Sequence, residues 1–398
     1  MQDSSVVPVP RAPEVLGSLL PIMVAVFVGF LVVGMGLPVL PLHVHDHLGF
    51  GPFVVGLVTG AQFVAALVTR MWAGSYADTR GAKRAVIAGL SAAAGAGGLY
   101  LLSLELQGNP TASVLTLLAG RALLGGGESF IITGALGWGL ALVGTKNTGR
   151  VMAWMGTAMY AAFAAGAPVG TALYGGQGFA ALAWATTLVP AMVILLVAPL
   201  RPVEPVTQGR PSYLRVLRSV WIPGLALAMS SLGFGAVTAF SALHFSQRGW
   251  NSGWMAFTSF ALCFMAARVM FGHMVDRSGG IRVAAISLVV EAAGQLILWK
   301  ATWAGMAIAG AALTGLGYSL VYPGLGVEAV RRAPPESRAL AMGAYTSCLD
   351  LALGFGMPAL GIVADHAGLA TVFLVSAGVI CASLAVTLQL RRPALRST

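Results

Sequence analysis

The sequence predicts an all-α membrane protein with twelve transmembrane helices in two pseudo-symmetric six-helix bundles. Charged residues make up 9% of the chain and the mean hydropathy is +0.84, whereas an ordinary globular protein has about 25% charged residues. Apolar runs of about 20 residues, enough to cross about 30 Å of hydrocarbon as a helix, recur along the whole chain. One charged motif also occurs twice, about half a chain length apart.

The apolar runs are continuous, which favours helices over the alternating strands of a β-barrel. We expect spans at residues 16–42, 53–76, 83–104, 112–142, 149–174, 178–200, 220–245, 253–276, 281–303, 305–330, 338–362 and 368–390. The segment 201–218 contains three prolines and four arginines. It predicts a cytoplasmic linker between an N-terminal bundle, residues 1–200, and a C-terminal bundle, residues 219–398.

The basic residues indicate the topology. A net charge of +10 would fit a nucleic-acid partner. The placement of the basic residues along the chain explains the positive charge in another way. With a cytoplasmic N-terminus, all but three of the 23 Lys and Arg residues fall on the cytoplasmic side, the exceptions being Arg121, Arg248 and Lys300. Such an excess marks the cytoplasmic side of a membrane protein. We therefore expect both termini in the cytoplasm and no nucleic-acid partner.

The stretch 70–84, between the second and third spans, carries the repeated motif. Its members are Gly74, Asp78, Gly81, Lys83 and Arg84. The pattern returns 198 positions later as Gly272, Asp276, Gly279 and Arg282, with Ile281 in place of the lysine. The stretch predicts a tight, charged, solvent-facing turn, and its return predicts a duplicated six-helix unit.

The duplication extends to the fourth and tenth spans, where Gly125, Gly127 and Ser129 return 190 positions later. The duplicated loop motif and the twelve spans resemble the major facilitator superfamily, and the resemblance covers nearly the whole chain. It implies a transporter whose substrate binds near the membrane midplane between two halves. The halves would rock to expose the substrate to each side in turn.

In this family the loop is thought to latch the two halves together while the transporter is open to the outside. The resemblance implies a latch at Gly74, Asp78, Gly81, Lys83, Arg84, Gly272, Asp276 and Arg282. Asp78 is placed to pair with an arginine or to accept from the N–H groups of a neighbouring helix end. Gly74 allows close helix contact, and Gly81 permits the turn. A solvated charge cluster that merely fixes the topology is the alternative.

Arg121 is the one basic residue that we expect deep in a span, where an isolated charge costs roughly 3 kcal/mol by insertion scales. Glu128 follows seven residues later, two turns away on the same helical face. Arg121 with Gly125 and Gly127 resembles the fourth-span motif of superfamily exporters, whose arginine is implicated in proton transfer. We expect Glu128 to carry a proton and Arg121 to modulate it. A purely structural ion pair is the alternative.

Asp350 in the eleventh span is the second deep carboxylate, and no cation lies near it in the sequence. We expect it to face the central cavity and to carry a proton or hold a cationic substrate group. A protonated carboxyl hydrogen-bonded between helices is an equal alternative. For Glu291 in the ninth span we expect a structural or lipid-edge role, and for Glu328 a surface ion pair beside Arg331.

The fifth span contains Gly156, Gly166, Pro168 and Gly170, which resemble a motif associated with antiporters. Glycines there allow close packing and proline bends the helix. Ala167 separates the Gly-Pro pair of the family pattern, so the match is partial. The candidates for lining a substrate cavity are Tyr160, Phe240, Tyr318, Tyr322, Tyr345 and Thr346. Packing or lipid contact is the commoner role of such aromatic residues.

His43, His45, Asp46 and His47 form a potential metal cluster on the first external loop. We expect these side chains to be exposed, and no second cluster completes a site, so we expect no metal. The sequence contains no Walker loop, Gly-x-Ser-x-Gly turn or Cys-x-x-Cys pair. We therefore expect no cofactor and no enzymatic activity.

Three stretches, residues 37–50, the Arg121 motif and residues 345–350, resemble the YhhS-like branch of bacterial inner-membrane transporters, sometimes labelled arabinose-efflux-like. That label implies no proven substrate. We expect proton-coupled export of a small organic solute, sugar-like or drug-like, across the inner membrane. We expect a monomer in the lipid bilayer whose partners are that solute and protons. An importer or symporter would have the same fold, and the partial fifth-span motif is the sequence argument against it. A non-transporting membrane sensor is the other alternative.

Overall fold

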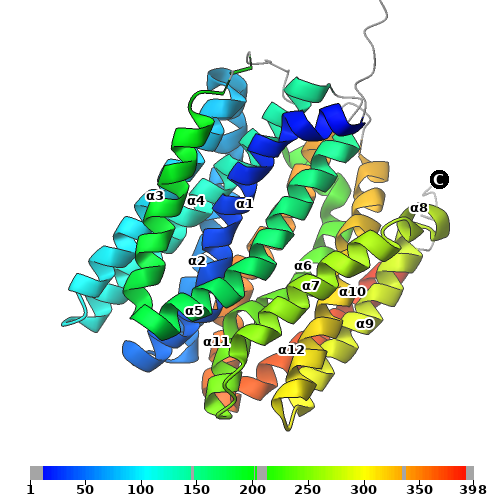
Figure 1. Ribbon diagram of the computed structural model, residues 1–398. Helices are drawn as coiled ribbons and strands as arrows, with labels where there is room; N and C mark the ends of the chain where they lie inside the picture. The colour runs from blue at the N-terminus through cyan, green and yellow to red at the C-terminus, as the bar shows by residue number, and fades with distance from the viewer. Residues whose placement is uncertain (1–11, 145–147, 201, 204–212, 334–337, 391–398) are drawn as a thin grey trace, which may run out of the picture.

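The computed structural model describes residues 12–144, 148–200, 202–203, 213–333 and 338–390. Within these residues the chain is helical and contains no strand. The long helices run side by side through one bundle, with the first half of the chain on one side and the second half on the other (Figure 1). This is the fold class that the composition and the apolar runs predict.

The elements of the first half are α1 (Ala12–Leu42), the π-helix η1 (His43–His47), α2 (Pro52–Arg80), α3 (Ala82–Glu105), α4 (Pro110–Val143) and α5 (Thr148–Val197). Those of the second half are α6 (Tyr213–Gln247), α7 (Gly253–Phe271), α8 (Met274–Ser278), α9 (Gly280–Lys300), α10 (Ala304–Arg332), α11 (Arg338–Ala367) and α12 (Leu369–Gln389). Helix α6 begins inside the segment expected to be a linker, and most of that segment lies outside the described residues. The boundaries of the two bundles therefore remain a prediction.

Helix α5 contains two of the expected spans. Gly178 within it has φ 73° and ψ −169°, a conformation that favours glycine and interrupts the helix. The apolar part of α5 is 44 residues long, about twice the length of one crossing. The described residues contain 11 segments long and apolar enough to span a membrane. Because α5 supplies two crossings, these 11 segments make twelve crossings, the number that the sequence predicts.

The two halves repeat the same hydrogen bond between equivalent helices. The Ser129 hydroxyl of α4 donates to the Ala66 carbonyl of α2 at 2.8 Å, and the Ser319 hydroxyl of α10 donates to the Phe264 carbonyl of α7 at 2.7 Å. The serines are 190 positions apart and their acceptors 198 positions apart. These are the offsets at which the sequence motifs repeat.

A second contact between equivalent helices, made at a glycine in each half, is repeated at the same offsets. A Cβ atom on Gly125 would collide with the backbone of Gln62, and one on Gly315 would collide with the backbone of Phe260. Close approach of α4 to α2, and of α10 to α7, therefore depends on glycine in both halves. The duplicated unit is thus a repeat of packing as well as of sequence.

The turn between α2 and α3 requires glycine as well. Gly81 has φ 96° and its repeat Gly279 has φ 85°, values that other residues rarely adopt. The prediction that the whole stretch 70–84 is a solvent-facing turn is wrong, because α2 stays helical to Arg80 and α3 begins at Ala82. The second copy differs, since α7 ends at Phe271 and the short α8 follows.

The two halves meet where α2 packs on α11, α5 on α7 and α1 on α6. Gly56 and Gly60 of α2 lie so close to the backbone of Met357 and Gly354 that a Cβ on either glycine would collide with it. These contacts close the bundle at the end where α2 begins, which we call the far end. The opposite end, with the start of α1, the α2–α3 turn and the end of α12, we call the terminal end.

Towards the terminal end, α2 separates from the second half. The side chains of Met71 and Trp72 are 64% and 65% exposed. A Cβ on Gly74 would meet no atom of the described residues within 4 Å. The halves are therefore in contact at the far end and parted along the last turns of α2.

Candidate transport site

Glu128 lies at the contact of α4 with α2. Gly125, one turn earlier, lets α4 approach the backbone of Gln62, and this brings the two side chains together. The Gln62 amide donates to Glu128 Oε2 at 2.5 Å. Glu128 therefore accepts a hydrogen bond from a neutral side chain. It also lies within reach of the charges of Asp350, Arg70 and Arg121.

Arg70 and Asp350 form an ion pair between the two halves. Arg70 Nη2 of α2 lies 2.5 Å from Asp350 Oδ2 of α11, and the two side chains are 24% and 5% exposed. Arg70 was expected among the basic residues at the cytoplasmic surface, and this placement is wrong. Asp350 has no cation near it in the sequence, but the fold supplies one from 280 residues away. The pair therefore links α2 to α11 across the boundary between the halves.

Arg268, the repeat of Arg70, is a second arginine inside the bundle. Its Nη2 donates to the Ser319 carbonyl at 2.8 Å, and its guanidinium lies 5.1 Å from the centre of the Phe264 ring, a cation–π contact. Its Nε is buried and has no hydrogen-bond partner among the residues that the structure describes. The expectation that Arg121 is the one deep basic residue is therefore wrong, because Arg70 and Arg268 also lie inside the bundle.

Aromatic rings connect the halves beside these charges. Tyr160 of α5 stacks on Phe264 of α7 with ring centres 3.8 Å apart. On the second half, Tyr318 stacks on Phe234 at 5.7 Å and its hydroxyl lies 3.1 Å from Ser231 Oγ. Tyr160 is partly exposed, whereas Tyr318 is buried. Of these two candidates for substrate contact, Tyr160 is the more accessible.

The other predicted lining residues lie on α6, α10 and α11. The Tyr322 hydroxyl lies 2.7 Å from Thr346 Oγ1, and both side chains are partly exposed. The Tyr345 hydroxyl donates to the Tyr322 carbonyl at 2.9 Å and its ring is fully buried. Phe240 is also fully buried, and among the described residues it makes no ring contact with the others. These positions make Tyr322 and Thr346 better candidates for substrate contact than Tyr345 and Phe240.

Arg121 is fully buried but does not pair with Glu128. Its three guanidinium nitrogens lack hydrogen-bond partners in the described part of the chain. The Tyr100 hydroxyl is close enough to interact with the guanidinium, and Gly36 of α1 faces it. The ion pair considered as an alternative for these residues is therefore not formed in this conformation. The role of Arg121 as a modulator of Glu128 remains a prediction.

The residues expected to form the latch lie at the terminal end. Asp78, Arg84, Asp276 and Arg282 are exposed there. Lys83 donates to the carbonyls of Ala198 and Leu200, at 2.6 Å in each case. It therefore joins the start of α3 to the end of α5 within the first half. Gly74 makes no close helix contact in this conformation, contrary to the reason given for it from the sequence, whereas Gly81 forms the turn as expected. A Cβ on Gly272 would collide with the Arg268 carbonyl.

The antiporter-like glycines pack α5 on α1. A Cβ on Gly166 or Gly170 would collide with the backbone around Gly34 and Met35. No atom of the described part of the chain would lie within 4 Å of a Cβ on Gly156. Pro168 lies within the same helix. The close packing expected of this motif therefore holds at Gly166 and Gly170 and not at Gly156.

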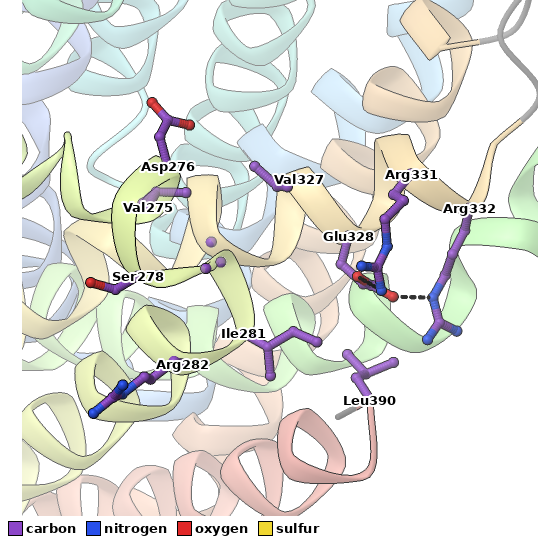
Figure 2. A pocket seen from close by; sticks show the side chains of 13 residues that line it. Val275, Asp276, Ser278, Ile281, Arg282, Val327, Glu328, Arg331, Arg332 and Leu390 are labelled. Carbon is purple, nitrogen blue, oxygen red and sulfur yellow. Dashed lines mark hydrogen bonds and ion pairs between the residues drawn. The ribbon is translucent and has the colours of Figure 1, made fainter. Parts of the chain in front are cut away.

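Two further acidic residues lie deeper than expected. Glu291 is fully buried and accepts from the Ser230 hydroxyl at 2.6 Å, so a lipid-edge position is wrong and a structural one agrees with its contacts. Glu328 pairs with Arg331 and Arg332 at 2.7 Å each (Figure 2). The ion pair is as predicted, but the carboxylate is 5% exposed and is not on the surface.

The histidine cluster forms the π-helix η1 at the far end. His43 is buried and stacks on Phe179 with ring centres 4.0 Å apart, so the expectation that it is exposed is wrong. His45 Nδ1 lies 2.8 Å from Asp46 Oδ1. No group of three metal-ligating side chains occurs among the residues that were searched, namely the described ones.

Comparison with known proteins places this geometry in a family. The family model of the Major Facilitator Superfamily matches residues 22–257 and 251–398. The chain belongs to the Major Facilitator Superfamily. The superfamily consists of transporters rather than enzymes. This chain is therefore a multi-pass membrane protein of a transporter family, as the loop motif predicted.

Relatives of the same superfamily cover most of the chain. An uncharacterized MFS-type transporter of Salmonella typhimurium is 42% identical over 363 residues, which cover 91% of this chain and 93% of the relative. One of Burkholderia pseudomallei is 42% identical over 361 residues, covering 91% of this chain and 89% of the relative. These relatives support the family and name no substrate.

Solved structures of superfamily members share the fold. The nucleoside transporter NupG has a TM-score of 0.74 at 14% identity, covering 94% of this chain and 100% of that one. A bacterial homolog of the human lysosomal transporter Spinster, solved in an inward-facing and occupied conformation, has a TM-score of 0.74 at 13% identity, covering 96% and 97%. The human organic anion transporter MFSD10 has a TM-score of 0.66 at 17% identity, covering 94% and 100%. At these identities the likeness concerns the fold alone.

Sequence reasoning missed four residues of this candidate site. Gln62, Arg70, Arg268 and Phe264 were not among its candidates. Arg70 and Arg268 could have been found, because both fall within the expected spans 53–76 and 253–276 and are related by the repeat. A basic residue repeated inside two spans is costly in lipid and indicates an interior role.

Proposed function

We propose that this protein is a secondary active transporter that exports a small organic solute across the inner membrane in exchange for protons. Substrate binds at the midplane between the halves, which alternate between openings to the two sides. Glu128 and Asp350 carry the proton, and Arg121 modulates the site. The protein acts as a monomer in the bilayer, and no cofactor takes part.

The ion pair of Arg70 with Asp350 beside Glu128 is the observation that carries this proposal. The pair joins α2 to α11 across the boundary between the halves. A proton or a cationic substrate group that binds Asp350 releases Arg70, and the released guanidinium can turn towards Glu128. Binding then favours one arrangement of the halves over the other, which is what coupling requires.

The excess of basic residues at the terminal end supports a cytoplasmic position for it and for both termini. With that orientation, the contacts of Gly56 and Gly60 close the outer side, and the parted turns after Arg70 face the cytoplasm. The conformation is then inward-facing. The resemblance of residues 37–50, the Arg121 motif and residues 345–350 to the YhhS-like branch supports membership of that branch.

The side chains around the ion pair support an organic solute with both polar and aromatic parts. Tyr160 offers a ring face, and Tyr322 with Thr346 offers hydroxyl groups beside it. A sugar-like or drug-like solute can use both kinds of contact. Because transporters of similar fold handle nucleosides and organic anions, such solutes belong in a test panel beside sugars and cationic drugs.

The test is transport by the purified full chain in proteoliposomes with an imposed pH gradient. We expect one class of compound to be expelled against its gradient when the opposite compartment is acidic, with proton movement in the opposite direction. Glu128→Gln and Asp350→Asn should both abolish this exchange. Glu105→Gln, which alters an exposed carboxylate at the end of α3, is the matched control and should leave it unchanged. Exchange that persists in both site variants contradicts the proposal.

The partial fifth-span motif supports export over import, since Gly166 and Gly170 fit the antiporter pattern. In the same vesicles, counterflow under the imposed pH gradient separates export from import. An importer or symporter moves solute and protons in the same direction, whereas the proposed exporter moves them in opposite directions. A sensor that does not transport is the remaining alternative. It predicts ligand binding without any proton movement.

A further inference from the structure

The two halves repeat an arginine but not its partner. Arg268 of α7 follows Arg70 of α2 by 198 residues, which is the offset of the repeat. Arg70 forms an ion pair with Asp350 of α11. In the part of the chain that the structure describes, Arg268 forms an ion pair with no carboxylate. A guanidinium is always charged, and a charge inside a membrane bundle is costly unless it is paired.

The repeat also indicates where a counter-ion for Arg268 belongs. The contact of α2 with α11 corresponds to the contact of α7 with α5. Pro168 of α5 and Pro358 of α11 are 190 residues apart, and the same offset relates Tyr160 to Asp350. The position equivalent to the aspartate is therefore a tyrosine, and its hydroxyl is ordinarily neutral. Tyr160 lies within reach of the charge of Arg268, as the repeat predicts, but it supplies no negative charge.

The guanidinium of Arg268 is held in place and still has donors to spare. Its Nη2 donates to the Ser319 carbonyl of α10 at 2.8 Å, and its centre lies 5.1 Å from the centre of the Phe264 ring. Its Nε has no hydrogen-bond partner among the described residues although it is buried. An arginine can bind a carboxylate through two parallel N–H···O bonds. Arg268 is therefore positioned for an acceptor that these residues do not provide.

The carboxylates nearest to the centre of the protein have other partners. Asp350 is paired with Arg70, so a move of Asp350 to Arg268 would leave Arg70 unpaired instead. The charges that act on Glu128 are those of Asp350, Arg70 and Arg121, and Arg268 is not one of them. The missing counter-ion of Arg268 therefore has to come from outside the chain.

The groups around Arg268 suit an organic ligand better than an inorganic ion. The side chains of Arg268, Tyr160 and Tyr322 are all partly exposed. Tyr160 stacks on Phe264, the same ring that contacts the guanidinium. Tyr322 also lies within reach of the charge of Arg268, and its hydroxyl is 2.7 Å from Thr346 Oγ1. A solute between the halves thus meets a ring face, hydroxyl groups and an unpaired cation.

We propose that Arg268 binds a carboxylate of the transported solute, in the way that Arg70 binds Asp350. The solute is a small organic acid, and a ring or other flat part of it lies on Tyr160. Its hydroxyl or carbonyl groups contact the Tyr322 hydroxyl. This inference rests on the proposed transport site and narrows its solute from organic compounds in general to organic anions.

The test is binding to the purified full chain in detergent, measured by calorimetry with acids and their neutral amides. The pairs are benzoate and benzamide, phenylacetate and phenylacetamide, and gluconate and gluconamide. At least one acid should bind wild type about tenfold more tightly than its amide, the value of one hydrogen bond to a charged group. Arg268→Gln should abolish this preference, and Arg268→Lys, which keeps the charge, should retain part of it.

A second pair of variants leaves Arg268 in place. Tyr160→Asp puts a carboxylate at the position that Asp350 has in the other half, so it should pair with Arg268 and abolish the preference for acids. Tyr160→Asn has the same size without the charge and is the matched control. It should weaken acid and amide alike, because both lose the ring of Tyr160, and should keep the preference for the acid.

Two results would overturn the proposal. One is wild type that binds none of the acids more tightly than its amide, and the other is a preference for acids that persists in folded Arg268→Gln. Binding needs no proton gradient, so the outcome is separate from that of the export proposal. Proton exchange with neutral or cationic solutes alone would support export and contradict an acid site at Arg268. Binding of acids at Arg268 without proton exchange would do the reverse.

Discussion

Arg70 Nη2 of α2 lies 2.5 Å from Asp350 Oδ2 of α11, although 280 residues separate the two in the chain. The pair crosses between the two halves at the level where they begin to part, and both groups are largely shielded from water. A charge pair in this position opposes any motion that separates α2 from α11. In the transport cycle proposed above, this contact has to break and form again.

Removing one partner of this pair should destabilise the protein more than removing both. Arg70→Met leaves the Asp350 carboxylate buried and unpaired, which costs about 3 kcal/mol, the lower end for such a pair. The double variant Arg70→Met/Asp350→Leu should recover most of that loss but should not transport. Thermal unfolding of the four proteins in detergent gives the coupling energy as a double-mutant cycle. Strictly additive effects would show that the two side chains do not interact.

Closure at the far end should depend on Gly60. Valine at this position would collide with the backbone of Gly354, so Gly60→Val should hold α2 away from α11 and slow transport severely. Spin labels at Leu57 and Ile362, which are 37% and 48% exposed, should report a longer distance in the variant. Gly378→Ala, at a glycine with open space around it, is the control. An unchanged distance would mean that the halves are not held together at this point.

Glu291 should contribute to stability and not to proton-coupled transport. Glu291→Gln keeps an acceptor for the Ser230 hydroxyl and should leave proton-coupled transport intact. Glu291→Leu removes the acceptor and leaves the buried Ser230 hydroxyl without this partner, which costs about 1–3 kcal/mol. Thermal unfolding together with vesicle transport separates the two effects. Loss of proton movement in a stable Glu291→Gln variant would make this carboxylate part of the coupling instead.

Asp78 and Lys83, on either side of the turn between α2 and α3, should have different functions. Asp78→Asn should cut transport while leaving membrane insertion intact, because the latch needs the charge. Lys83→Met removes two hydrogen bonds to the end of α5 and should lower stability by about 2 kcal/mol. Transport rates and unfolding temperatures of both variants provide the test. If Asp78→Asn transports at the wild-type rate, the latch is not needed.

Local sequence predicted the helices well because each one is long and apolar. A span of about 20 apolar residues has no stable alternative to a helix in lipid, so the spans could be drawn without a fold. The site was harder to predict. Glu128 and Asp350 were found because a lone carboxylate in an apolar run is conspicuous. Gln62 and Phe264 were missed, because neither residue type is unusual in a membrane helix.

The sequence by itself determined the twelve crossings, the duplication and the family, since these depend on hydropathy and on motifs within one stretch of chain. Only the tertiary structure decided which charges meet. It paired Asp350 with Arg70 and left Arg121 apart from Glu128, although the second pair lies on one helix. The reason is that the glycines of α2, α4 and α11 set how closely those helices pack, and helix packing fixes which side chains come within hydrogen-bonding distance.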